Sequence, residues 1–183
     1  MAANGKGTAI LRTIVRALLL LCLIVWLGGL LFFGAVVAPV AFGTLMPMVS
    51  DPALGLHVAG TMVRNSLLQL HWMGLIAGAA MIFFCAVERV MQWTRRSVAP
   101  HIIVLAAMMV LTAFSQFSVI PRMETLRVQA GTVIDAPNSD NPARVEFNRL
   151  HHLSTQLEGG VLIGGLVLLV LLARPEPLLE PTS

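Results

Sequence analysis

The chain has 183 residues, of which 57% are hydrophobic and only 11% are charged. Soluble domains carry about 25% charged residues, so this composition excludes an ordinary soluble domain and predicts an integral membrane protein surrounded by lipid. The net charge is only +3 and the basic residues form no single run, which argues against nucleic acid as a partner. No glycine-rich nucleotide loop, Walker loop or G-x-S-x-G motif is present, so nothing indicates a soluble enzyme.

Apolar segments predict the fold, because about twenty apolar residues in a helix cross the hydrocarbon of a bilayer. The first segment is too long for the apolar part of a signal peptide. We predict an all-α, integral membrane four-helix bundle that forms a single domain over residues 1–183, with flexible tails at 1–9 and 175–183. The predicted spans are about 17–39, 67–87, 102–120 and 153–173.

Prolines and capping residues suggest where these helices end. Pro39 and Pro121 follow the first and third apolar segments, and proline interrupts an α-helix. We therefore expect the outer ends of these two spans there, with 122–136 as an outward continuation beyond a proline kink. Asp140 or Asn141 is expected to cap the last helix.

The basic residues indicate the orientation, since Lys and Arg are enriched on the cytoplasmic side. Four spans place both termini on one side of the membrane. The first span has three basic residues before it and none directly after it, which predicts cytoplasmic termini. The second and fourth helices should extend past the outer interface. The basic residues near the spans on the side of the termini are Lys6, Arg12, Arg16, Arg89, Arg95, Arg96 and Arg174, against Arg64, Arg122, Arg127, Arg144 and Arg149 on the other side.

Three polar residues on different helices should lie at one depth. His71, Gln116 and Glu158 are 15 to 17 positions from the cytoplasmic ends of their helices, or about 22–25 Å at ~1.5 Å per residue. We therefore predict a polar cluster in the outer half of the bundle. His151 precedes Glu158 by seven positions on the same stripe of its helix. The remaining members expected above this level are Arg64, Arg122 and His152.

Three interpretations of this cluster remain open. Imidazole and carboxylate together bind transition metals or haem, with His71 and His151 as ligands of the cofactor and Glu158 as a further metal ligand or counter-charge. The same groups relay protons in membrane proteins. The cluster is also consistent with a hydrogen-bonded network that only holds the helices together.

Two G-x-x-x-G spacings, Gly74–Gly78 and Gly160–Gly164, predict close helix packing. These glycine faces serve either neighbouring helices of the same chain or a second copy in a homo-oligomer.

Two segments resemble a known family. The segments WLGGLLFFGAVVAPVAF and FNRLHHLSTQLEGGVLIGGLVLL are similar to the small four-span family of unknown function related to transmembrane protein 205. They are more distantly similar to the copper-resistance D-type membrane group, which includes copper-handling proteins and a haem-associated porphyrinogen oxidase. The resemblance implies a protein of the bacterial inner membrane and favours a histidine-centred site. The motif positions are Trp26, Gly28, Pro39, Phe42, Phe147, Arg149, His151 and Ser154.

Together these patterns predict a multi-pass inner-membrane protein without catalytic activity. The first alternative is a haem- or metal-binding protein with a His/Glu site at the outer end of the bundle. The second is an oligomeric small-solute or proton-coupled carrier in which Glu158 titrates.

Overall fold

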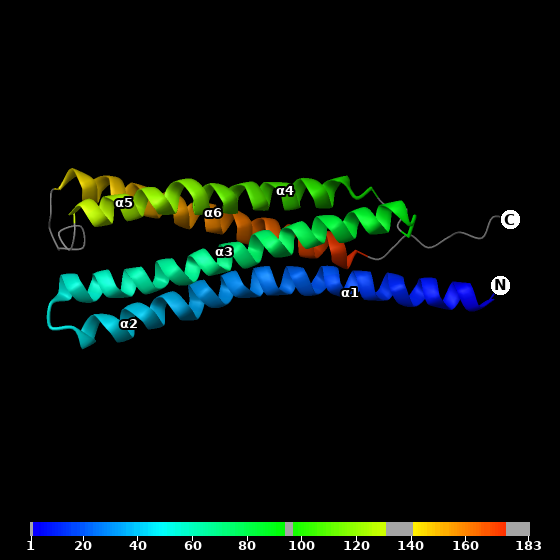
Figure 1. The fold of residues 1–183 in the computed structure, drawn as a ribbon, viewed down its shortest axis with the longest axis horizontal. Coiled ribbons are helices and arrows are strands. Elements are labelled where there is room, and N and C mark those ends of the chain that lie inside the picture. The colour runs from blue at the N-terminus through cyan, green and yellow to red at the C-terminus, as the bar shows by residue number, and fades with distance from the viewer. Residues whose placement is uncertain (1, 94–96, 131–140, 175–183) are drawn as a thin grey trace.

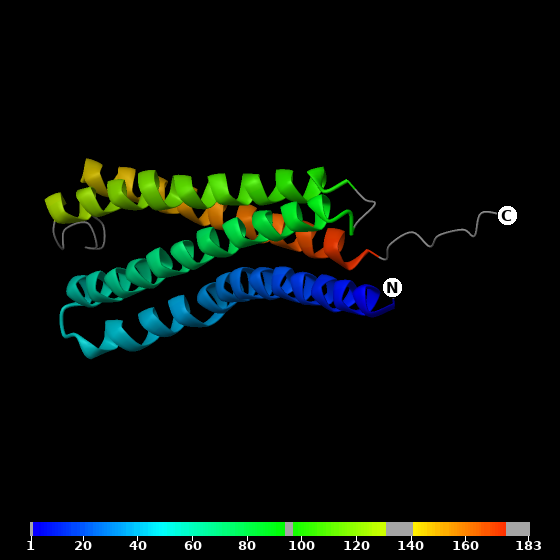
Figure 2. The same ribbon diagram turned by 45° about the vertical axis from the view of Figure 1, so that its right-hand side comes forward.

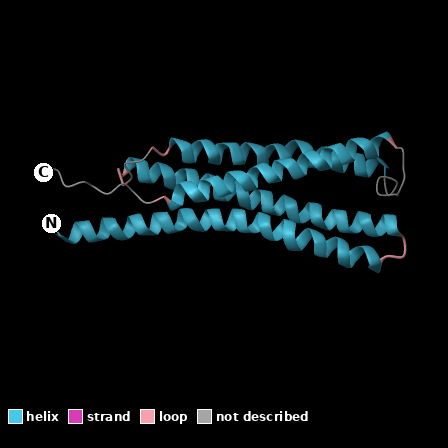
Figure 3. Ribbon diagram, turned by 180° about the vertical axis from the view of Figure 1, so that it is seen from behind, coloured by secondary structure: helices cyan, strands magenta, loops and turns pink. Residues whose placement is uncertain are grey.

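The computed structural model describes residues 2–93, 97–130 and 141–174, and within these ranges it contains helices and no strand (Figure 3). Helical elements that follow one another directly in the chain join end to end, so that the molecule consists of four long rods. The rods run back and forth along one axis (Figure 1). The elements in chain order are α1 (Ala2–Phe32), η1 (Phe33–Val37), α2 (Ala38–Met48), α3 (Pro52–Val90), α4 (Ala99–Phe114), η2 (Ser115–Val119), α5 (Ile120–Ala130) and α6 (Pro142–Ala173).

All four rods are long and apolar enough to cross a membrane, as the sequence predicted. They comprise Lys6–Met48, Pro52–Val90, Ala99–Ala130 and Pro142–Ala173. Each rod turns large apolar side chains outward. Ile24, Ile76, Ile103 and Ile163, one from each rod, are all more than 60% exposed. Apolar surface of this extent is unfavourable in water but is compatible with lipid tails.

The helices do not end at Pro39 and Pro121. The continuation beyond Pro121 agrees with the outward extension that we expected there, whereas the continuation beyond Pro39 was not expected. The helices continue to Met48 and Ala130. The proline ring clashes with the carbonyl four residues earlier, which here belongs to Ala35 or Phe117. At both places the chain widens into a π-helical turn, η1 or η2, and the clash is absorbed by a local bend instead of a helix end.

The start of α6 agrees with the expected cap. The Asn141 side chain accepts a hydrogen bond of 2.9 Å from the backbone N–H of Ala143, whereas Asp140 lies outside the described residues. Asp51, which we had not singled out, caps α3 in the same way through the N–H of Ala53 at 2.9 Å. The expected tail over residues 1–9 is helical from Ala2, and 175–183 lie outside the described part.

The rods pair into two hairpins. The first consists of α1, η1, α2 and α3, and the second of α4, η2, α5 and α6. Near the termini the hairpins pack together, with α1 against α6 and α3 against α4. Towards the opposite end, here called the loop end, α2 packs on α3 and α5 on α6, and the two pairs diverge (Figures 1 and 2).

A large apolar cluster joins all four rods in the half of the bundle that contains the termini. Leu19, Leu105, Met81 and Leu168 come from four different helices and are each at most 1% exposed. The indole of Trp26 is buried to the same degree and packs on α3, where a Cβ atom at Gly74 would lie 2.7 Å from the indole Cε2. Because glycine has no side chain, Gly74 leaves room for the indole of Trp26.

The glycine spacings are used within the chain. Gly74 and Gly78 face Trp26, while Gly160 faces Leu111 and Gly164 faces Met108. These contacts occupy both G-x-x-x-G faces, which were also candidates for contact with a second copy.

In the loop-end half, the larger apolar side chains that are buried in the described part of the chain cluster in the second hairpin. A small cluster is built around Val119, Leu126 and Leu150, all from η2, α5 and α6. Polar side chains bridge the two hairpins there. Arg64 of α3 pairs with Glu124 of α5 at 3.2 Å, and the guanidinium of Arg127 lies against Gly60 of α3.

Candidate functional site

A chain of hydrogen bonds crosses from one hairpin to the other at the level where they begin to part. His71 lies near the midpoint of α3, with its ring 1% exposed. Its Nδ1 is 3.0 Å from Oε1 of Gln116, and its Nε2 is 2.6 Å from Oε1 of Glu158. Gln116 and Glu158 also lie near the midpoints of their rods. The structure therefore brings together the three residues that were expected at one depth.

The geometry defines how many protons the group holds. The amide oxygen of Gln116 accepts, so His71 Nδ1 carries a hydrogen. Nε2 and Glu158 Oε1 then need one hydrogen between them, because two lone pairs at 2.6 Å would repel. Either an imidazolium faces a carboxylate or a neutral imidazole faces a carboxylic acid. Both arrangements have zero net charge, which is the form that a low-dielectric interior favours.

Glu158 has capacity for more hydrogen bonds than it uses. Its Oε1 also accepts from the hydroxyl of Ser115 at 3.3 Å. Its other oxygen, Oε2, is buried without a hydrogen-bond partner among the described residues, as is the hydroxyl of Thr112. Thr112 precedes Gln116 by one helical turn and is 1% exposed. A buried polar atom without a partner is uncommon in native structures, and these two lie close to the contact between His71 and Glu158.

The π-helical turn η2 presents Ser115 and Gln116 to the cluster. Residues 115 and 116 open this turn, in which the N–H of Ile120 bonds to the carbonyl of Ser115 instead of the carbonyl of residue 116. Pro121 causes the wider turn, as described above. π-Helical turns inside α-helices occur frequently at functional sites.

The residues expected above this level are dispersed. His151 is exposed and its ring is stacked with Phe147 at a centroid distance of 6.5 Å. It lies seven residues, or about 10 Å along the helix, from Glu158. His152 and Arg122 are exposed, and Arg64 is engaged with Glu124. Of the seven predicted residues, the structure assembles His71, Gln116 and Glu158.

Several polar residues were missed by the sequence reasoning. Ser115 and Thr112 share the Gln116 face at helical spacing, which was a usable signal. Glu124 was not singled out, although it lies two residues after Arg122 in a segment that we expected to continue the helix. Arg127 is 7% exposed and lies 5.1 Å above the ring of Phe147. No local pattern indicates that contact, because it joins α5 to α6.

The assembled cluster does not resemble a metal centre. Both ring nitrogens of His71 are hydrogen-bonded, and the second proposed ligand, His151, is not part of the cluster. Within the described ranges no group of three or more His, Cys, Asp or Glu residues has an arrangement that could hold a metal ion.

Comparison with known proteins assigns a family. Residues 21–132, more than half of the chain, match the domain of unknown function DUF4149. This region contains His71 and Gln116, whereas Glu158 lies beyond it. No curated protein and no solved structure is significantly similar to the chain, and the comparisons show no link to transmembrane protein 205 or the copper-resistance D group. The chain belongs to the DUF4149 family of domains of unknown function.

Proposed function

We propose that this protein is a non-catalytic, multi-pass protein of the bacterial inner membrane whose function depends on one proton held between His71 and Glu158. The observation that carries the proposal is the 2.6 Å contact between His71 Nε2 and Glu158 Oε1, with Nδ1 engaged by Gln116. Basic residues before the first span support cytoplasmic termini. Ionisable residues within membrane helices commonly belong to proton or substrate pathways.

A purely structural network would explain the contact but not the surroundings of Glu158. Its second oxygen has no partner among the described residues. Its side chain is 18% exposed, against 1% for His71. Loss of the shared proton would leave one net negative charge in a poorly solvated place, which is costly unless a cation or a changed conformation compensates. Release of the proton is therefore expected to be coupled to another event, as in a proton-coupled carrier.

The surroundings favour proton exchange with the loop end of the bundle. Along α6, His151 and Thr155 precede Glu158 on one stripe and are exposed. Towards the termini, the large apolar cluster lies between the three residues and the end of the bundle. Because polar residues lie towards the loop end and apolar residues lie towards the termini, we expect the proton to exchange through the loop end.

The haem or metal alternative is weaker than the proton-binding function. To ligate a metal, His71 would have to give up one of its two hydrogen bonds. The partner ligand His151 lies about 10 Å further along α6 and its ring is stacked on Phe147.

The proposal can be tested by nuclear magnetic resonance of ¹⁵N-histidine-labelled protein in liposomes, with His71 assigned by its loss in His71→Gln. In the wild type we expect the Nδ1 signal to show an attached hydrogen and the Nε2 signal to show a hydrogen shared with Glu158. The shared-hydrogen signal should disappear in Glu158→Gln, whose amide cannot exchange a proton with the ring. Glu146→Gln, which removes a partly exposed carboxylate from the same helix, is the matched control. If the wild type shows no hydrogen shared between His71 and Glu158, the proposal is wrong.

A further inference from the structure

The buried oxygen atoms around Glu158 include several that the shared proton does not use. Oε2 of Glu158 has no hydrogen-bond partner among the described residues, and neither has the hydroxyl of Thr112. Thr112 and Ser115 are each at most 1% exposed. A polar atom that has lost its hydration without gaining a partner is unfavourable, so a ligand that bonds to these oxygens would stabilise the folded protein.

The hydroxyl of Thr112 differs from those of other threonines in the described helices. Threonine in a helix commonly donates to the backbone carbonyl four residues earlier. This bond is formed at 2.9–3.0 Å by Thr13, Thr61, Thr125 and Thr155. Thr112 does not form it, so its hydroxyl oxygen is available to a ligand.

Thr112 and Glu158 lie at one level of the bundle. The hydroxyl of Ser115 donates to Oε1 of Glu158 at 3.3 Å, and Thr112 lies three residues earlier, about 4.5 Å along the helix. A second contact between the same two rods joins Leu111 to Gly160, where a Cβ atom would lie 3.0 Å from Cδ1 of the leucine. Thr112 therefore lies between two points at which these rods touch, next to Glu158 in height.

The π-helical turn η2 adds a backbone oxygen without a regular donor. In an α-helix the carbonyl of Gln116 would accept from the N–H of Ile120, but that N–H bonds to the carbonyl of Ser115. In a π-helix the donor would be residue 121, which is proline and has no N–H. Backbone carbonyls at irregular points of membrane helices coordinate Na⁺ in transporters.

We propose that Glu158 binds a sodium ion in exchange for the proton that it shares with His71. The further oxygen ligands are the hydroxyls of Thr112 and Ser115 and the carbonyl of Gln116. Hard cations prefer such oxygen ligands. Without the shared proton the cluster has one net negative charge, which Na⁺ cancels, whereas a divalent cation would leave a positive charge in a low-dielectric interior. This inference rests on the proposed function, since the ion takes the place of the proton.

The exchange depends on pH through His71 and Glu158. His71 contacts Glu158 from α3, and η2 contributes Ser115 and Gln116, which do not titrate. The first rod also packs on α6, but the chain has no charged residue and no histidine from residue 17 to residue 48. Protons and sodium ions therefore compete for the same carboxylate.

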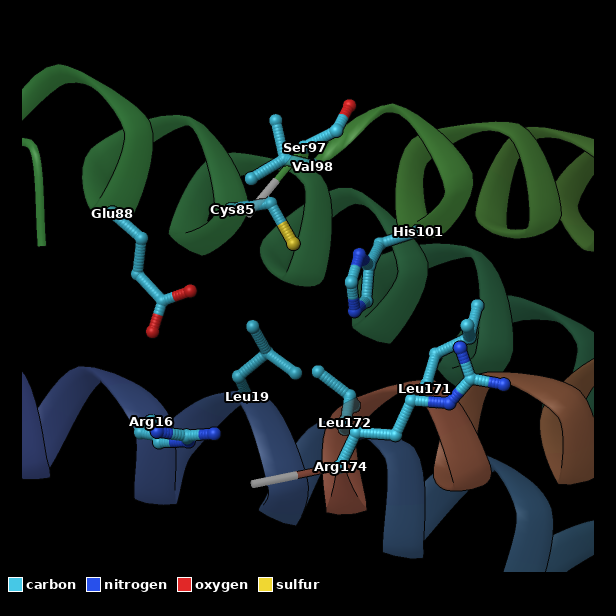
Figure 4. Close-up of a pocket in the computed structure, with 10 residues that line it drawn as sticks. All are labelled: Arg16, Leu19, Cys85, Glu88, Ser97, Val98, His101, Leu171, Leu172 and Arg174. Carbon is cyan, nitrogen blue, oxygen red and sulfur yellow. The ribbon is translucent and has the colours of Figure 1, made fainter. Parts of the chain in front are cut away.

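The charges near the termini favour entry of the ion from the loop end. A cavity of about 40 Å³ near the termini is lined by Arg16, His101 and Arg174, against one acid, Glu88 (Figure 4). A lining with excess positive charge repels a cation. The large apolar cluster also lies between this cavity and Glu158, so the ion is expected to follow the same route as the proton.

The test is the thermal stability of the full-length protein in a neutral mild detergent, with NaCl compared with KCl and choline chloride at equal ionic strength. A ligand that binds only the folded state raises Tm, so Tm should be several degrees higher in NaCl than in either comparison salt. The difference should grow as the pH is raised, because fewer protons then compete for Glu158. Equal Tm values in NaCl and KCl would overturn the sodium site, and a difference that does not change with pH would overturn the exchange.

Variants localise the effect. Thr112→Val removes one ligand and leaves the contact between His71 and Glu158 in place. In choline chloride it should be at least as stable as the wild type, because the lost hydroxyl has no partner among the described residues, but most of the gain in NaCl should be lost. Thr61→Val is the matched control and should retain the full gain, because its hydroxyl already bonds to the backbone carbonyl of His57 at 2.9 Å. A full gain in Thr112→Val would overturn the assignment of the site.

Failure of the sodium site and failure of the proposed function give different results. If the wild type shows the hydrogen shared between His71 and Glu158 by nuclear magnetic resonance but has equal Tm values in NaCl and KCl, the sodium site alone is wrong. If the shared hydrogen is absent, the proposed function is wrong and the exchange fails with it.

Discussion

Replacement of Glu158 by leucine should show how much the polar cluster contributes to the free energy of unfolding. In Glu158→Leu, Nε2 of His71 loses its partner while the ring remains 1% exposed. A buried polar atom left without a partner costs about 1–3 kcal/mol, and we expect the free energy of unfolding to fall by that amount. Glu158→Gln should cost less than about 1 kcal/mol, because the amide can donate to Nε2 while Nδ1 still donates to Gln116.

The interaction itself is measured by a double-mutant cycle with His71→Leu, Glu158→Leu and the double variant. Cycles for side-chain hydrogen bonds in membrane helices average about 0.6 kcal/mol and reach about 1.7 kcal/mol. The short distance of 2.6 Å and the burial of His71 place the expected coupling in the upper part of that range. The double variant should therefore lose less stability than the sum of the two single variants.

Reversible unfolding in mixed detergent micelles, followed by circular dichroism, supplies these free energies. Independent sites are additive within about 0.3–0.5 kcal/mol. If the two replacements are additive within that margin, the contact between His71 and Glu158 contributes no stability and the reasoning fails. An equal loss in Glu158→Gln and Glu158→Leu would also contradict it, because only the leucine lacks a donor.

Two further predictions concern packing and surface charge, and both use the same unfolding measurement. Gly74→Ala places a methyl group against the rigid indole of Trp26 and should lower stability by about 1–3 kcal/mol. Gly159→Ala, where a Cβ meets nothing within 4 Å, should not lower it. Arg149→Gln breaks an ion pair within one helix in which the arginine side chain is 76% exposed, and should change stability by less than about 1 kcal/mol. A larger loss there would mean that the pair is shielded from solvent.

The sequence was sufficient to predict the four apolar helices and the shared depth of three polar residues. Both follow from regular helix geometry, since 1.5 Å per residue converts sequence position into height. The same argument failed for His151, because height along α6 does not say which ring contacts which neighbour. The stacking on Phe147 decides where that histidine lies.

The ends of the helices were harder to predict, for a different reason. Proline signals a disturbed helix, but whether the chain stops or bends depends on how the surroundings accommodate the displaced carbonyl. At Pro39 and Pro121 the displaced carbonyl is accommodated by a π-helical turn, so the helix persists. The contribution of η2 to the site could not be derived from propensity alone.

The arrangement of the two hairpins gives the bond between His71 and Glu158 a mechanical role. Near the termini the hairpins are held by a shared apolar cluster, whereas towards the loop end polar contacts such as Arg64–Glu124 connect them. The two hairpins are therefore joined by apolar packing near the termini and by polar contacts at the loop end. His71 belongs to the first hairpin, and Gln116 and Glu158 belong to the second. All three lie at the level where the hairpins begin to part. A separation of the hairpins at the loop end would therefore break the Arg64–Glu124 ion pair first and the contact between His71 and Glu158 next.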